Sequence, residues 1–172
     1  MNKIKEYDFV VYGATGFTGK LVVEYLVHKY SNNSQIKWAL AGRNLEKLES
    51  VAASKNVPEG TGLLEVDSNH IASIEEMISK TKCVLTTVGP YQLYGNDIVS
   101  ACAKSGIDYV DLCGEPGWMY EKINELTETA RETGSRIVFS CGFDSIPFDL
   151  GVLFLQNEVT RRYGKPSVNV RG

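Results

Sequence analysis

A strand, a glycine-rich turn and the start of a helix follow one another near the amino terminus. Residues 8–26 read DFVVYGATGFTGKLVVEYL, and Gly13, Gly16 and Gly19 stand at GxxGxxG spacing where an apolar run gives way to helical periodicity. In this context the glycines predict a tight turn, a close approach of the backbone to a ligand, and close packing of the helix. The first N–H groups of such a helix bind anions such as a pyrophosphate. A glycine-rich turn without a ligand is the alternative.

Strand-like and helix-like segments alternate along the rest of the chain. Six apolar runs read as strands: 7–12, 36–41, 62–66, 83–88, 109–112 and 136–140. We expect the helices between them to bury four apolar stripes: Leu21, Tyr25 and Leu26; Leu45, Leu48 and Ala52; Ile71, Ile74 and Ile78; Ile123, Leu126 and Ala130. Strands joined by single helices form parallel sheets with helices on both faces. The sequence therefore predicts an α/β, doubly wound Rossmann fold with about six parallel strands.

The length of 172 residues suits one well-buried domain. A last helix is expected from 147 to about 161, and SVNV at 167–170 reads as the beginning of another strand. We therefore expect an NAD(P)-binding Rossmann domain over 1–163 and the start of a truncated substrate or C-terminal domain over 164–172.

Composition excludes several classes of function. The net charge is −3 and no basic block occurs, which argues against nucleic acid as a partner. The start, MNKIKEYD, lacks the apolar core of a signal peptide, and no run approaches the roughly 18 apolar residues of a membrane span. The four cysteines form no CxxC pair, so we interpret them as reduced thiols of a cytoplasmic protein without a metal site.

Unusual residues gather where the six predicted strands end. These ends carry GATGFTG, AGRN, VDS, VGPY, DLCGEP and CGFDSIP. Ligands of doubly wound sheets bind at the carboxyl ends of the strands. We therefore expect the functional site at this edge.

The end of the second strand indicates which dinucleotide binds. NAD sites usually place Asp or Glu there, whereas this chain has Arg43, with Lys47 one turn further on. A guanidinium can grip a 2′-phosphate with two hydrogen bonds, so Arg43 favours NADP(H) over NAD(H). A solvated surface role for Arg43 is the alternative. Asp67, at the end of the third strand, could touch the adenine or cap the helix that follows.

Candidates for proton transfer lie at the ends of the fourth, fifth and sixth strands. Gly89 and Pro90 are expected beside the nicotinamide, and the weak catalytic candidates are Tyr91, Tyr94, Glu115 and Asp144, the last adjoining Ser145. Each could instead cap a helix or hold a loop, and Asp144 and Ser145 directly precede a helix with Pro147 in its first turn.

One apparent catalytic pair is interpreted as structural. Tyr25 and Lys29 form a YxxxK pair like that of short-chain dehydrogenases, but they lie on the first helix, behind the glycine turn. The lack of this pair elsewhere argues against that class and against nucleotide-sugar epimerases and dehydratases. No role is assigned to His28 or His70.

Five segments together resemble the N-terminal domain of the saccharopine dehydrogenase-like oxidoreductases, a group that includes the bacterial trans-acting enoyl reductases. They are VVYGATGFTGKLV, WALAGRNLEKLE, TTVGPYQLYG, YVDLCGEP and CGFDSIPFDLGV, spread in order over most of the chain. The resemblance implies a Rossmann domain that binds NAD(P)H, with a substrate domain that this shorter chain lacks. It places Gly13, Ala14, Thr15, Gly16, Phe17 and Thr18 around the pyrophosphate. It also places Arg43 and Asn44 at the adenosine phosphate, and Gly89, Pro90 and Tyr91 beside the nicotinamide.

The leading hypothesis is the cofactor domain of an NADP(H)-dependent oxidoreductase that moves a hydride to or from a C=C or C=N bond. The cofactor supplies the redox chemistry, and a small-molecule or lipid-linked substrate is expected to bind with the missing domain. A homodimer is the assembly that we consider. The alternative is a non-catalytic redox sensor or regulatory protein that binds NADP(H).

Overall fold

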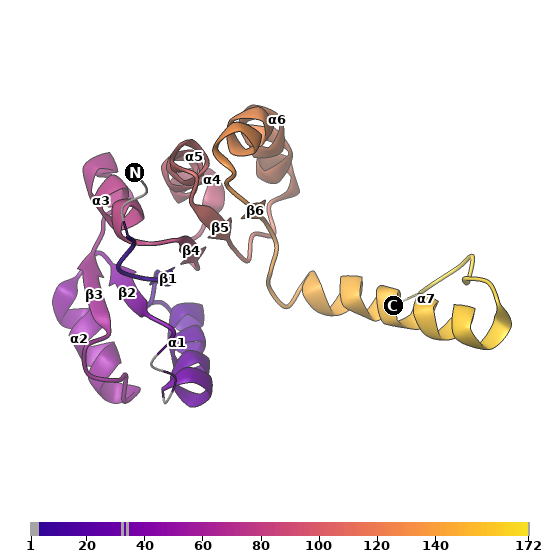
Figure 1. Ribbon diagram of the computed structural model, residues 1–172, viewed down its shortest axis with the longest axis horizontal. Coiled ribbons are helices and arrows are strands. Elements are labelled where there is room, and N and C mark those ends of the chain that lie inside the picture. Colours follow the sequence, from indigo (N-terminus) through magenta and orange to yellow (C-terminus); the bar gives the residue numbers. More distant parts are fainter. Residues whose placement is uncertain (1–3, 32, 34, 172) are drawn as a thin grey trace.

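We describe the protein from a computed structural model, which covers residues 4–31, 33 and 35–171. Six strands alternate with helices along the described chain (Figure 1). In order, the elements are β1 (Phe9–Tyr12), α1 (Phe17–Tyr30), β2 (Trp38–Gly42), α2 (Leu45–Ser54), β3 (Gly62–Glu65), α3 (Ile71–Lys80), β4 (Cys83–Thr86), α4 (Tyr91–Tyr94), α5 (Asn96–Ser105), β5 (Asp108–Val110), α6 (Pro116–Thr133), β6 (Ile137–Val138) and α7 (Ile146–Tyr163).

The six strands form one parallel sheet in the order β3-β2-β1-β4-β5-β6. β1 lies at the centre, with Val10 opposite Ala39 of β2 on one side and Val84 of β4 on the other. The order reverses between β1 and β4, which is the switch point where doubly wound sheets bind ligands. The predicted α/β Rossmann architecture is confirmed.

Two apolar cores lie on opposite faces of the sheet because successive side chains of a strand alternate in direction. On one face, α3, α5 and α6 cover Val10, Val84 and Tyr109. On the other face, α1 and α2 cover Val11 and Leu40. The second core includes no fully buried residue of β4, β5 or β6. The expectation that helices cover both faces is therefore only partly met.

The predicted buried stripes are wrong at five positions and need correction. Leu21 and Tyr25 are 52% and 58% exposed, and α1 buries Gly19, Val23 and Leu26 instead. The reason is steric, because Gly19 must face the turn at Gly13 and this contact sets the rotation of the helix. The first members of the other stripes, Leu45, Ile71 and Ile123, are also largely exposed, whereas Leu48, Ile74, Ile78 and Leu126 are buried.

The end of the chain differs from the prediction in three ways. The sixth strand contains only Ile137 and Val138, and residues 167–170 form no strand. The backbone N–H and C=O of Ser167 bond to the side chain of Gln156, which holds this segment against α7. Ser145 precedes α7 but makes no side-chain capping bond.

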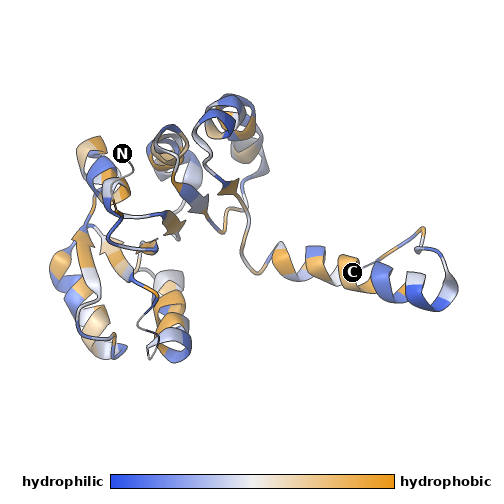
Figure 2. Cartoon of the chain, viewed as in Figure 1, coloured by the Kyte–Doolittle hydropathy of each residue, from blue (hydrophilic) through white to orange (hydrophobic). Residues whose placement is uncertain are grey.

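The last helix, α7, extends away from the sheet (Figure 1). It has no buried residue. Apolar side chains occupy its first half, and charged ones gather toward its end (Figure 2). Among the described residues, no helix combines the length and apolar character needed to cross a membrane.

Candidate functional site

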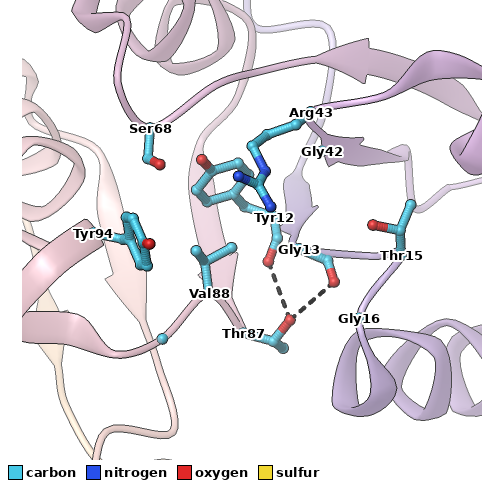
Figure 3. A pocket seen from close by; sticks show the side chains of 11 residues that line it. Tyr12, Gly13, Thr15, Gly16, Gly42, Arg43, Ser68, Thr87, Val88 and Tyr94 are labelled. Carbon is cyan, nitrogen blue, oxygen red and sulfur yellow. Dashed lines mark hydrogen bonds between the residues drawn. The ribbon is translucent and has the colours of Figure 1, made fainter.

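A cavity of about 230 Å³ lies at the carboxyl ends of the first four strands (Figure 3). Its residues come from the segments that follow β1, β2, β3 and β4, as expected for a switch-point site. The lining consists of Tyr12, Gly13, Thr15, Gly16, Gly42, Arg43, Ser68, Thr87, Val88, Gly89 and Tyr94.

The start of α1 opens onto this cavity without a side-chain cap. Gly16 is the N-cap residue, no side chain bonds to the first turn, and that turn contains no acidic residue. By contrast, the side chain of Asn44 caps α2 by accepting a bond from the N–H of Lys47 at 2.7 Å. The first amides of α1 therefore remain available for an anion.

Glycines are required at two points of the turn by steric contact. Gly13 has φ +89°, and a Cβ on it would lie 2.7 Å from Thr87 Oγ1. A Cβ on Gly19 would lie 2.1 Å from the carbonyl oxygen of Gly13, so the helix packs against the turn itself. The Thr87 hydroxyl lies 3.3 Å from the carbonyl oxygen of Tyr12 and 3.2 Å from that of Gly13, which ties β4 to the turn (Figure 3).

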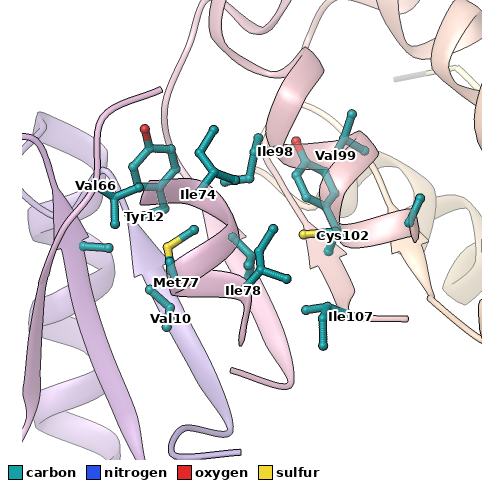
Figure 4. Packing of buried hydrophobic residues seen from close by; sticks show 14 of the residues in the cluster. Val10, Tyr12, Val66, Ile74, Met77, Ile78, Ile98, Val99, Cys102 and Ile107 are labelled. Carbon is teal, nitrogen blue, oxygen red and sulfur yellow. The ribbon is translucent and has the colours of Figure 1, made fainter. Parts of the chain in front are cut away.

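Tyr12, at the end of β1, and Arg43, directly after β2, form one wall of the cavity (Figure 3). The ring of Tyr12 packs with Val66 and Ile74 in the core, while its hydroxyl points out of that cluster (Figure 4). Burial raises the pKa of Tyr12, and bonding to Ser68 and the charge of Arg43 partly oppose this shift. The Tyr12 side chain is therefore neutral, and Arg43 supplies the positive charge of this wall.

The donor set fits the phosphates of a dinucleotide. Gly16, at the uncapped start of α1, and the exposed Arg43 line the same cavity, and none of the described lining residues is acidic. A Cβ on Gly16 would meet only the carbonyl oxygen of Gly13, at 3.3 Å, so the backbone is otherwise open there. Complete ligand pockets enclose about 300–1,000 Å³. The cavity thus accommodates part of a dinucleotide.

The structure gathers some of the predicted cofactor-binding residues and the catalytic candidate Tyr94, and it separates others. Those that line the cavity are Gly13, Thr15, Gly16, Arg43, Gly89 and Tyr94. Those outside the lining are Ala14, which is buried; Phe17, which is 83% exposed; Thr18; Gly19; Asn44; Asp67; Pro90; and Tyr91. Tyr12 and Ser68 line the cavity but were not predicted as binding residues, although their positions at strand ends could have indicated them.

Asp67 does not cap α3, whose N-cap residue is His70. Its carboxylate accepts bonds from the backbone and the side chain of Asn69, both at 3.0 Å. This local turn holds the segment after β3 and so supports the position of Ser68.

Two of the proton-transfer candidates are held by internal bonds. The Tyr91 hydroxyl lies 3.3 Å from the carbonyl oxygen of Thr86 and accepts from the N–H of Leu112 at 3.4 Å. Burial raises the pKa of this phenol. Glu115 accepts from the N–H groups of Tyr91 and Gln92, at 2.7 and 3.0 Å. These contacts favour positioning roles, and of the four candidates only Tyr94 lines the cavity.

Asp144, the fourth candidate, lies in a different hollow. It lines a space of about 360 Å³ with Thr18 and Val22 of α1 and Ser145. Its side chain is exposed. The structure therefore does not bring Asp144 together with Tyr94.

Asp111 is a buried carboxylate that sequence reasoning did not single out. Its side chain accepts from Cys113 N at 3.0 Å, Ser140 N at 2.8 Å and the Tyr109 hydroxyl at 2.9 Å. Burial raises its pKa, and these bonds oppose the shift. Asp111 thus links the ends of β5 and β6.

Sequence comparison supports the family expected from the motifs. A trans-acting enoyl reductase of Mycobacterium tuberculosis is 45% identical over 150 residues, which are 86% of this chain and 35% of that protein. A lipid droplet localized protein of Caenorhabditis elegans is 41% identical over 160 residues, 89% of this chain and 37% of that protein. This chain thus spans about a third of the length of these relatives.

Solved structures share the fold at low sequence identity. Saccharopine dehydrogenase (L-Glu forming) of Saccharomyces cerevisiae superposes with a TM-score of 0.71 and 17% identity over 90% of this chain and 32% of that one. Triphenylmethane reductase of Citrobacter sp., in complex with NADP(H), superposes with a TM-score of 0.57 and 20% identity. The superposition covers 92% of this chain and 55% of that one. Residues 9–138 match the family described as the saccharopine dehydrogenase NADP binding domain. The chain therefore belongs to the saccharopine dehydrogenase NADP-binding domain family.

Proposed function

We propose that this chain is the cofactor-binding part of an NADP(H)-dependent oxidoreductase and prefers NADP(H) to NAD(H). The observation that carries the proposal is the placement of Arg43 in one cavity with the uncapped start of α1. The two features suit two different phosphates of the same ligand. A carboxylate in place of Arg43 would repel a 2′-phosphate, whereas the guanidinium attracts it.

Each part of the cavity has a distinct task in this proposal. The amides that follow Gly16 bind the pyrophosphate, and Arg43 binds the 2′-phosphate. Val88, Gly89 and Tyr94 form the wall at the end of β4 and orient the rest of the dinucleotide. The bound cofactor supplies the hydride chemistry.

The substrate proposal rests on relatives and on length. We infer hydride transfer to or from a C=C or C=N bond of a small-molecule or lipid-linked substrate, which agrees with the names of the enoyl reductase and saccharopine dehydrogenase relatives. Since this chain spans about a third of its curated relatives, substrate binding is assigned to a further domain. Residues 1–163 form the cofactor domain in this division, and 164–172 lead into the next one. A cytoplasmic location and a homodimer are parts of the same proposal.

Isothermal titration calorimetry with NADPH and NADH tests the binding proposal. NADPH should bind more tightly to the wild type, and Arg43→Ala should weaken NADPH binding about tenfold or more while NADH binding changes little. The control is Lys165→Ala, at an exposed position beyond α7. Equal losses for both cofactors in the Arg43 variant would place the 2′-phosphate elsewhere.

An absorbance assay separates an oxidoreductase from a redox sensor. A longer homologous protein that contains this domain and its substrate domain should consume NADPH with an unsaturated or imine substrate. Binding of NADPH without consumption across such substrates would instead favour the non-catalytic sensor.

A further inference from the structure

Half of one sheet face carries no helix. On the side where α1 and α2 pack, these helices cover β1, β2 and β3 and reach β4 only at Leu85, which packs partly against their core, whereas no residue of β5 or β6 belongs to that core among the described residues. The space beside α1 forms the hollow of about 360 Å³, which is lined by Val22 of α1 and by Leu85 and Val110 of the sheet.

The side chains on this uncovered half are apolar. Leu85 on β4, Val110 on β5 and Val138 on β6 alternate with neighbours that are packed in the opposite core, so they point to the open side. Val138 is 49% exposed. Parallel strands that are apolar on both sides are typical of sheets covered on both faces. The composition of these strands therefore calls for a covering element.

An apolar helix without a packing partner directly follows β6. In α7, Phe148, Leu153 and Phe154 are 60%, 55% and 73% exposed, and the first half of the helix is apolar except at Asp149. Helices of this kind are normally buried.

The accessible surface of the chain is also larger than that of a compact protein of the same mass. The accessible surface is 11090 Å², whereas a compact monomer of 19.0 kDa should expose about 8,400 Å². The excess of roughly 2,700 Å² is larger than the roughly 800 Å² that each partner buries in a standard interface.

The connection between β6 and α7 lets the helix reach this face. The seven residues 139–145 join the two elements, slightly more than the roughly two to six residues of ordinary strand–helix connections. Asp111 holds its first part, because Ser140 N donates to the carboxylate and Cys141 N donates to the Asp111 carbonyl at 2.7 Å. Residues 142–145 then set the direction of α7.

We propose that the uncovered face of β4, β5 and β6 is the docking surface for α7 of the same chain, and that the extended helix is one of two positions. A tethered helix meets its own sheet at an effective concentration in about the millimolar range, which favours docking within one chain over exchange between two. Docking covers one side of α7 and leaves its other side for a further domain.

Small-angle X-ray scattering coupled to size-exclusion chromatography tests the docking. A compact chain of 172 residues should have a radius of gyration of about 16 Å, at the mass of one chain. Val138→Glu places a charge on the docking surface, so it should increase the radius and accelerate proteolysis within residues 146–163. Val168→Glu is the matched control, because Val168 is 99% exposed and belongs to neither apolar core, and it should leave both unchanged.

A second variant guards against loss of folding in the first. Phe154→Glu alters only the exposed helix, so it should undock α7 while the unfolding midpoint of the sheet domain stays near that of the wild type. The proposal is overturned if the wild-type radius equals that of both variants. A compact particle with the mass of two chains would also overturn it, because α7 would then dock on a second copy.

Discussion

Arg43 and Asn44 are neighbours in the sequence and have different tasks in the structure. The Arg43 side chain lines the cavity. The Asn44 side chain turns back to the N–H of Lys47 and caps α2. The resemblance had placed both at the adenosine phosphate. The geometry supports Arg43 as the group that meets the phosphate and gives Asn44 a local structural role.

Two substitutions at Asn44 separate capping from cofactor selection. Asn44→Ala should lower the free energy of unfolding by about 1 kcal/mol, because the cap is lost, and should leave the ratio of NADPH to NADH affinity unchanged. Asn44→Asp keeps a capping oxygen but adds a negative charge beside Arg43, so it should weaken the binding of NADPH more than the binding of NADH. Urea unfolding and calorimetry provide the two measurements. A loss of NADPH affinity in Asn44→Ala as large as in Arg43→Ala would show that Asn44 contacts the phosphate.

For single residues, the structural roles of glycines could be predicted from the sequence better than the directions of aromatic side chains. Gly13 and Gly19 could be assigned because Gly13 has a positive φ and a Cβ on Gly19 would lie only 2.1 Å from the carbonyl oxygen of Gly13. The direction of Tyr91 could not be assigned, since its hydroxyl is taken up by Thr86 and Leu112, which lie on two different strand ends. Such contacts depend on the assembled sheet.

The elements around the cavity are fastened to one another by the segment after β5. Through Glu115, this segment holds the start of α4 by the amides of Tyr91 and Gln92. Since α4 is a single turn, it depends on this carboxylate for its position. Tyr94, at the end of the same turn, is thereby kept at the cavity wall.

Removal of the Glu115 carboxylate should loosen this wall. Glu115→Ala should lower the free energy of unfolding by about 1–3 kcal/mol, because two amides lose a charged acceptor. It should also weaken NADPH binding, since Gly89 and Tyr94 lose their fixed positions. Thermal unfolding and calorimetry measure these effects, with Glu132→Ala at an exposed position of α6 as the control. An unchanged NADPH affinity would show that α4 holds its place without Glu115.

Helix positions were predictable, but helix rotations were less so. Periodicity located the helices, and the glycines after α5 and α6 end them with φ +67° and +79°. The prediction of which face of α1 is buried was wrong, because a side-chain pattern alone does not reveal that Gly19 must meet the Gly13 carbonyl. A contact between backbone groups overrode apolar periodicity.

The stability of the whole molecule should carry the signature of one buried carboxyl. Burial raises the pKa of Asp111 above its ordinary value of 3.8, so the folded chain holds this proton more tightly than the unfolded chain. The free energy of unfolding that this group contributes therefore falls as pH rises from 3.8 through the raised pKa, and is constant above it.

Asp111→Asn removes this titration and keeps an oxygen acceptor. The difference in free energy of unfolding, wild type minus variant, should therefore decrease as pH rises above 3.8 and level off once the pH passes the raised pKa. Urea unfolding at several pH values measures the difference. Carboxylates whose pKa is lowered, such as Asp8 and Asp108, make the free energy of unfolding rise with pH. Their contributions cancel in the difference because the wild type and the variant both contain them. Parallel curves would contradict the assignment of Asp111 as the titrating group.

The overall fold was predictable because strands and helices alternate regularly and the first glycine turn marks the switch point. The incomplete cover of the sheet was not predictable. Periodicity indicates that α7 is a helix, but not whether it rests on the sheet. That choice depends on residues 142–145, where no repeating pattern exists to interpret.

All residues that line the dinucleotide cavity lie between Tyr12 and Tyr94. Recombination at Gly95 would therefore exchange the second half of the chain for that of another family member and keep every residue that lines this cavity. Chimeras made in this way would inherit nucleotide preference from one parent and the route toward the substrate from the other. Within such a family, new reactions can arise while the coenzyme stays the same.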